Sequence, residues 1–146
     1  MQRIILAAAL ASLLAAFPAF ADDSVGMVKT VSGVASIVAD GQSTAAVVGA
    51  HLYRGNVLKT GADGTMGITF NDDTVMSFGP DTEVSVDDFV YAPSEGKLKL
   101  EASISRGTLE YVSGVIAKLK PQAVAIKTPT GTIGVRGTRF VVKVDE

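Results

Sequence analysis

The sequence predicts an all-β protein: a compact domain of many short, mostly antiparallel strands, arranged as a twisted sandwich or as a β-solenoid-like stack. Apolar and polar residues alternate with a period of two along most of the chain after residue 21, which is the pattern of half-buried strands. Clusters of Gly, Pro, Asp and Asn separate the alternating segments and supply the backbone angles of tight turns. All 15 glycines lie after residue 21, as expected for a chain with many reversals.

The first element is predicted to be a secretory signal peptide rather than a strand. Arg3 precedes an uncharged apolar run over residues 4–17, and Ala19-Phe20-Ala21 has the small residues of an A-x-A cleavage site. A helix that crosses a membrane needs about 20 apolar residues, more than this run provides. We therefore expect removal of residues 1–21, an exported single domain over residues 22–146, and no transmembrane segment after cleavage.

Ten segments of the mature chain carry the strand pattern, and turn residues separate them. We expect strands over residues 27–38, 45–52, 57–60, 65–70, 75–78, 83–91, 98–104, 108–112, 123–127 and 139–144. We expect reversals at Asp40-Gly41 and over residues 61–64, 71–73, 79–81, 93–96 and 129–131.

At most one short helix is expected, near residues 113–119. Ser113 is a suitable cap, Val115, Ile116 and Leu119 share a face, and Pro121 ends the segment.

A weak internal sequence similarity, called the internal echo below, has two explanations. Lys-Thr, a turn, and then Gly-Thr-apolar-Gly-apolar occur twice, from Lys59 and again from Lys127. Either the chain contains two copies of one strand-turn-strand unit, or turns rich in Gly and Thr resemble one another through composition alone.

Composition excludes several classes of protein. Without Arg3 the 13 basic residues become 12, against 15 acidic ones, so a strongly basic nucleic-acid-binding protein is not expected. The chain has no cysteine, which rules out disulfides, thiolate metal sites and a cysteine nucleophile. Stability must therefore come from the core.

Residues 126–140 read IKTPTGTIGVRGTRF. This run resembles the closing signature of the FecR domain family, a Thr-Pro turn followed by a V-R-G-T-x-F strand. The resemblance covers about residues 26–144, with Asn56 where the family commonly has Asp. It implies an all-β periplasmic module. We expect this module to be non-catalytic and to sense or bind another protein in envelope signalling. The sigma-factor mechanism of the best-known members is not implied, because it depends on a cytoplasmic helical domain.

The signature residues are expected to have a mainly structural role, because Pro129 fixes φ and glycines recur every third residue to allow positive φ or close backbone approach. Arg136 has two interpretations, an ion pair that holds the fold together or an anion contact. The motif residues are Thr128, Pro129, Gly131, Gly134, Val135, Arg136, Gly137, Thr138 and Phe140.

No catalytic, cofactor or metal site is expected, so the chain is predicted not to be an enzyme. His51 is the only histidine, and a triad would have to use it. The pairs Asp72-Asp73 and Asp87-Asp88 do not have the spacing of a calcium-binding loop.

Charge is unevenly distributed: residues 61–96 carry eight acidic and no basic side chains, and residues 97–146 carry nine basic and four acidic ones. The two blocks either face each other within the fold or form patches that steer partners or self-association. Asp72, Asp73, Asp87 and Asp88 are the candidate interaction patch. Two other functions stay open: a structural part of a cell-envelope or surface assembly, and a small-ligand carrier or hydrolase that uses the acidic block.

Overall fold

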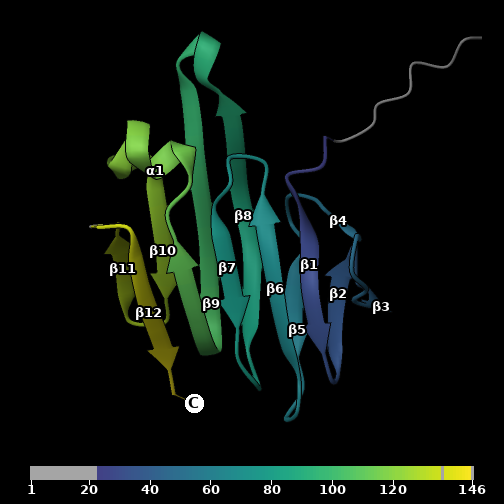
Figure 1. The fold of residues 1–146 in the computed structure, drawn as a ribbon. Coiled ribbons are helices and arrows are strands. Elements are labelled where there is room, and N and C mark those ends of the chain that lie inside the picture. The colour runs from purple at the N-terminus through teal and green to yellow at the C-terminus, as the bar shows by residue number, and fades with distance from the viewer. Residues whose placement is uncertain (1–22, 136, 146) are drawn as a thin grey trace, which may run out of the picture.

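Most of the strands form one hydrogen-bonded path that curls back on itself, so that its two halves face each other as layers, and the last three strands branch from this path (Figure 1). The computed structural model describes residues 23–135 and 137–145, so the predicted signal peptide lies outside the described residues. In chain order the elements are β1 (Gly26–Ser32), β2 (Ala35–Ala39), β3 (Gln42–Ala45), β4 (His51–Leu52), β5 (Val57–Thr60), β6 (Thr65–Phe70), β7 (Val75–Phe78), β8 (Glu83–Ala92), η1 (Pro93–Glu95), β9 (Lys97–Val112), α1 (Val115–Leu119), η2 (Pro121–Ala123), β10 (Val124–Thr128), β11 (Gly131–Gly134) and β12 (Arg139–Val144).

The long strand β9 belongs to both layers. Its first half pairs with β8 and, in parallel, with β10, and its second half pairs with β7 and β12. The path β3-β2-β5-β8 leads to β9 on one side, and β7-β6-β1-β4 leads away from it on the other. The Phe70 ring of β6 stacks on the Phe89 ring of β8 with centroids 5.3 Å apart, which shows that the layers pack face to face. The predicted all-β, mostly antiparallel fold is confirmed in its sandwich form.

The bend in β9 occurs at a glycine because no other residue fits there. Gly107 has φ +95°, and a Cβ on it would lie 2.4 Å from Thr82 Cα. A side chain is disfavoured at such a φ and is excluded by such a contact. The sequence analysis expected separate strands over residues 98–104 and 108–112, and this was wrong because Gly107 continues the strand instead of ending it.

Other strands differ from the predicted ranges, because alternation of apolar and polar residues did not reveal a turn or a loop within them. The expected strand over 27–38 is two strands, because Gly33 reverses the chain with φ +65°. Most of 45–52 is a loop tied to neighbouring strands by backbone bonds from Ala46 and Gly49. Residues 131–134, expected partly as a turn, form the additional strand β11.

The internal echo does not correspond to a repeated unit. β10 and β11 form an antiparallel hairpin, whereas β5 pairs with β2 and β8, and β6 pairs with β1 and β7. The two similar sequences therefore have different pairing, which supports the explanation by composition.

Apolar side chains from both layers fill the space between them, and α1 covers one end. Ile116 and Ala117 of α1 are buried, which confirms the one short helix. Within the described residues, no helix has the length and hydrophobicity needed to cross a membrane. The largest fully buried side chains are those of Tyr111, Phe70, Leu52, Leu58, Met66, Ile68, Met76, Leu100, Ile104, Leu109, Ile116 and Ile126.

A buried carboxylate fixes the start of α1. Asp72, in the β6–β7 turn, is fully buried. Its Oδ1 accepts a bond from Thr74 N at 3.1 Å, and its Oδ2 accepts bonds from Thr74 Oγ1 at 2.8 Å and from Ile116 N at 3.0 Å. Its carbonyl oxygen accepts from Val115 N at 2.7 Å. A residue far away in sequence thus satisfies the unpaired N–H groups of the helix.

Replacing Asp72 by Asn is expected to destabilise the protein by about 2 to 4 kcal/mol. Each carboxylate oxygen accepts from a backbone N–H, so either orientation of the amide places its NH₂ group against a donor. The matched control is Asp73→Asn, which removes the same charge from an exposed neighbour. Denaturant unfolding measures both variants, and equal midpoints would contradict the prediction.

Candidate functional site

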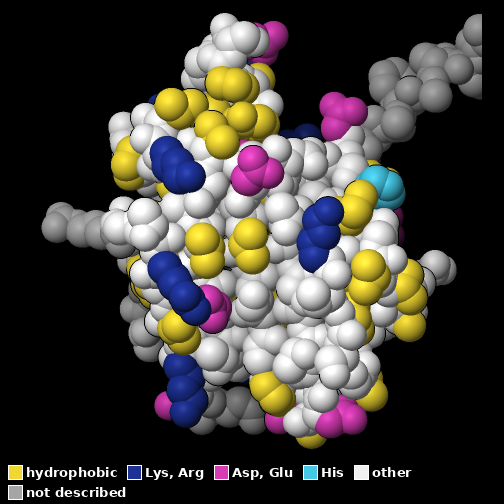
Figure 2. Space-filling model, viewed as in Figure 1, with side chains coloured by type: hydrophobic (Ala, Val, Ile, Leu, Met, Phe, Trp, Pro, Cys, Tyr) yellow, Lys and Arg dark blue, Asp and Glu magenta, His cyan; other side chains and the backbone are white. Residues whose placement is uncertain are grey.

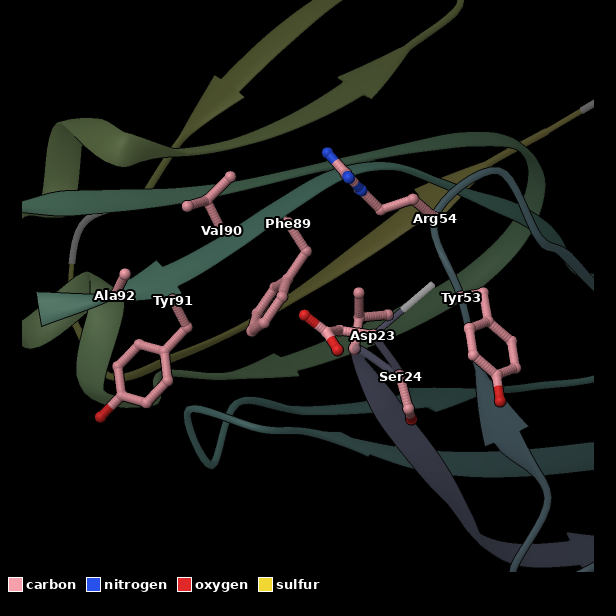
Figure 3. A pocket seen from close by; sticks show the side chains of 9 residues that line it. Asp23, Ser24, Tyr53, Arg54, Phe89, Val90, Tyr91 and Ala92 are labelled. Carbon is pink, nitrogen blue, oxygen red and sulfur yellow. The ribbon is translucent and has the colours of Figure 1, made fainter. Parts of the chain in front are cut away.

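A cleft with a volume of about 610 Å³ lies between the segment that precedes β1, the β4–β5 loop and the second half of β8. Figure 3 shows Tyr53 and Tyr91 at its two ends, with the Phe89 ring near the Asp23 carboxylate between them. None of the residues that line the cleft belongs to the sites predicted from the sequence. Its lining residues are Asp23, Ser24, Val25, Tyr53, Arg54, Phe89, Val90, Tyr91 and Ala92.

One wall of the cleft is a strand edge with no neighbouring strand. β5 pairs with β8 only over residues 83–85, and the segment before β5 adds two backbone bonds at Val86, from Gly55 N to Val86 O and from Val86 N to Asn56 O. Beyond Val86, β8 pairs with β9 alone among the described strands. The β8–β9 hairpin projects past the other strands (Figure 1). The open edge therefore exists because β8 is longer than β5, and it presents backbone N–H and C=O groups.

A β-bulge aims the aromatic side chains of this wall. The register of β8 against β9 shifts between Val86 and Asp88. Val84 and Val86 face the core before the shift, and Phe89 faces it afterwards, so the inward positions change from even to odd. Bulges redirect side chains in this way. Phe89 and the half-buried Tyr91 consequently lie on the same face of β8.

The opposite wall is shaped by Asn56, which stands where the resemblance described above leads us to expect Asp. Its Oδ1 accepts from Tyr53 N at 2.9 Å, and its N–H donates to Tyr53 O at 3.2 Å. Gly55 provides the positive φ of this turn. The amide oxygen makes the bond that an aspartate oxygen would make, so the substitution preserves the turn that carries Tyr53 and Arg54.

The charges at the rim are paired with one another. Asp88 lies 3.4 Å from Arg54 Nη1 and 3.2 Å from Lys99 Nζ, and Lys99 lies 3.6 Å from Glu101. Burial raises the pKa of Asp88, but hydrogen bonds from Lys99, Arg54 and Phe89 N, together with the charge of Lys99, outweigh it and lower the pKa. The Asp88 hydrogen bond and the charge of Glu101 raise the pKa of Lys99.

The acidic and basic blocks face each other because β8 and β9 are antiparallel neighbours. Ion pairs join Glu83 to Arg106 and Glu95 to Lys97, in addition to the Asp88–Lys99 pair. These contacts favour the internal interpretation of the charge blocks.

The four aspartates of the candidate interaction patch do not form one surface. Asp72 is buried, so its inclusion in the patch was wrong: its carboxylate bonds the protein's own backbone. Asp73 is exposed in the β6–β7 turn. Asp87 accepts from Ser85 Oγ at 2.8 Å and also from Ser103 Oγ. Binding by Asp73, Asp87 and Asp88 stays a prediction.

The signature residues bridge the two layers, away from the cleft. Ser113 N donates to Thr138 O at 2.8 Å, and the Phe140 ring stacks on Tyr111 at 4.8 Å. Thr128 Oγ1 donates to Gly131 O at 3.0 Å in the Pro129 turn, and Val135 is buried. Arg136 lies outside the described residues. These contacts support a structural role, which stays a prediction.

His51 has one side-chain neighbour relevant to catalysis. Its Nδ1 lies 3.2 Å from Ser24 Oγ, and that hydroxyl donates to Gly26 O at 2.9 Å. The serine proton is therefore directed to a carbonyl rather than to the imidazole. No carboxylate of residues 23–135 or 137–145 contacts the His51 ring, so the third member of a triad is missing from this part of the chain.

Replacing Gly137 by Val is expected to destabilise the protein by more than about 1 kcal/mol. Gly137 has φ +83°, whereas Gly134, also in open surroundings, does not have a positive φ. Gly137 is therefore the only one of the signature glycines Gly131, Gly134 and Gly137 that has the positive φ predicted for this segment. Gly134→Val is the matched control, because valine suits an exposed strand position. Equal unfolding midpoints for the two variants would contradict the role of φ.

Replacing Asp88 by Asn is expected to lower the melting temperature at pH 7, but not at low pH. Because the folded pKa of Asp88 is lowered from 3.8, its stabilising contribution is present above that value and is lost as the pH falls through the folded pKa. Melting of parent and variant between pH 7 and about 2 measures this. A difference that persists at the lowest pH would contradict the assignment.

Comparison with models of protein families identifies one family that matches this chain. The family model described as FecR protein matches residues 56–146, which span β5 to β12 and include the signature. Searches of curated proteins and of solved structures found no match. The match covers more than half of the chain, and the chain therefore belongs to the FecR family.

Proposed function

We propose that the chain is a non-catalytic protein-interaction or sensory module that is exported to the periplasm and functions in envelope signalling. Membership of the FecR family supports a signalling-related module. The apolar run and the A-x-A site before Asp22 support export. Cleavage after Ala21 is part of the proposal.

The observation that carries the proposal is the cleft beside the open edge of β8. An extended segment of a partner protein would pair with the backbone of Val90, Tyr91 and Ala92, because an unpaired strand edge is a template for another strand. Backbone bonds give affinity in this mode, and pockets for alternate side chains give specificity.

The side chains of the cleft match a polypeptide ligand. The half-buried Tyr91 offers an apolar surface next to the largely buried Phe89, and Tyr53 and Arg54 stand at the opposite wall. Tyr and Arg are enriched at protein interfaces and among the residues that dominate binding energy. Asp23 and Arg54 supply charges of both signs at the rim, which suits a segment with polar side chains next to its apolar ones.

A hydrolase or small-ligand carrier that uses the acidic block receives less support. Its carboxylates are buried, hydrogen-bonded or paired with basic side chains at most positions described above. Within the described residues, no group of three or more His, Asp or Glu side chains is placed to hold a metal ion. A structural role in an envelope assembly has one specific observation in its favour: among the described strands, β11 pairs with β10 alone and β12 pairs with β9 alone.

Tyr53→Ala and Tyr91→Ala together are expected to weaken the affinity for the partner by about 30-fold or more, since each such residue contributes on the order of 1 to 2 kcal/mol at an interface and about 1.4 kcal/mol corresponds to a tenfold change. The tagged protein is purified from the periplasm, its intact mass locates the cleavage site, and proteins captured from periplasmic extract are quantified by mass spectrometry. Leu119→Ala, an exposed apolar position outside the cleft, is the control.

Unchanged capture by the double variant, with an unchanged melting temperature, would contradict the proposed binding site. A small molecule that co-purifies with the parent and is lost from the variant would favour the ligand-carrier alternative. Recovery of the full 146-residue mass from the periplasm would contradict cleavage.

A further inference from the structure

We propose that β12 is a self-association edge, on which a second copy of this chain adds its own β12 in antiparallel orientation about a two-fold axis at Val142. β12 pairs with β9 on one side and with no other described strand. At six residues it is longer than the other terminal strands β3, β11 and β4. It therefore offers the longest free edge among these strands.

The side of the molecule next to this edge is incompletely covered. Two hollows of about 440 and 460 Å³ lie between β11 and β12. Ile133, Phe140 and Val144 are only partly buried there, and Val141 is 61% exposed. Figure 2 shows apolar, basic and acidic side chains together along the left side, where Figure 1 places β12. A second strand at this edge would cover the apolar side chains.

The sequence of β12 is complementary to itself when reversed. Residues 139–145 read RFVVKVD. With Val142 opposite Val142, the register places Arg139 opposite Asp145 and Phe140 opposite Val144 of the other copy. Val141 then faces the Lys143 stem. The two members of each pair lie on the same face of the sheet. Residues 139, 141, 143 and 145 share the outer face, and residues 140, 142 and 144 share the inner face.

The charges select this register. Within one chain, Arg139 Nη2 contacts Glu110 at 2.5 Å, and Lys143 Nζ lies 3.8 Å from Asp145. Bringing Arg139 beside Asp145 of the second copy creates a row of alternating sign: Glu110, Arg139, Asp145 and Lys143. The two-fold axis generates this row twice. A parallel pairing in register would instead place Arg139 against Arg139, which is unfavourable.

The other terminal strands lack these properties. All four residues of β3 are exposed and none is charged, and β4 has two residues. β11 is likewise uncharged and short. A short, uncharged strand that is exposed on both faces specifies its register weakly, whereas β12 combines half-buried apolar positions with charged residues at and just beyond its ends.

The first test is a charge exchange measured by sedimentation of the exported chain over a range of concentrations. Arg139→Asp and Asp145→Arg are each expected to raise the dimer dissociation constant by at least about tenfold, because each reverses two symmetry-related contacts. The double variant is expected to recover most of the affinity. Lys59→Asp, which reverses a charge on β5 next to Glu83, is the control and should leave the constant unchanged.

The second test uses the absence of cysteine from the chain. Val141→Cys mixed with Lys143→Cys should form an interchain disulfide at least about fivefold faster than either variant alone, because only the mixture places two cysteines directly opposite each other. Thr44→Cys, in the middle of β3, should remain unlinked. These positions are exposed, so the variants should not disturb the core, and melting curves check this.

Three results would overturn the proposal: a parent that remains monomeric up to about 1 mM, single charge reversals that do not weaken the dimer, or cross-linking at Thr44→Cys that exceeds that of the mixture. Failure of partner capture at the β8 cleft would leave these results unaffected, since the two surfaces lie on different strands.

Discussion

The architecture depends on one strand that serves two layers. β9 runs for 16 residues, and a strand of that length can contribute to two facing layers only if its backbone bends. Gly107 provides the bend, and Thr82 packs directly against it, with Thr82 Oγ1 accepting from Thr108 N at 3.0 Å. β8 and β10 attach on one side of this bend, and β7 and β12 attach on the other. The facing layers, and hence the core, follow from this one backbone conformation.

Buried polar groups then fix the parts that the apolar core leaves undefined. Without disulfides, the chain uses side-chain oxygens as connectors: Asp72 joins the β6–β7 turn to α1, and Thr60 Oγ1 accepts from Thr82 N while it donates to Gly79 O. A buried polar group is stabilising only when its partners are present. These contacts therefore specify one arrangement of turns as well as contributing stability.

Both proposed interaction surfaces are free strand edges. β8 extends beyond β5 and leaves an open edge beside the cleft, and β12 pairs with β9 alone among the described strands. Such edges invite pairing with another chain unless charge or shape prevents it. Here the charges near β8 are paired across to β9, whereas those of β12 are arranged so that a second copy would be attracted in one register.

The sequence by itself determined the fold class, because alternation with period two has one structural meaning when turn residues punctuate it. β5, β6, β7 and β12 have the bounds that alternation predicts, and the family follows from the V-R-G-T-x-F run. Tertiary structure alone decided that Gly107 bends a strand instead of ending it, that Asp72 is buried instead of exposed, and that Phe89 and Tyr91 lie across a cleft from Tyr53. Local sequence reports the spacing of side chains along the chain, but these features depend on contacts between residues tens of positions apart, such as Asp72 with Ile116, and no local pattern encodes such a partner.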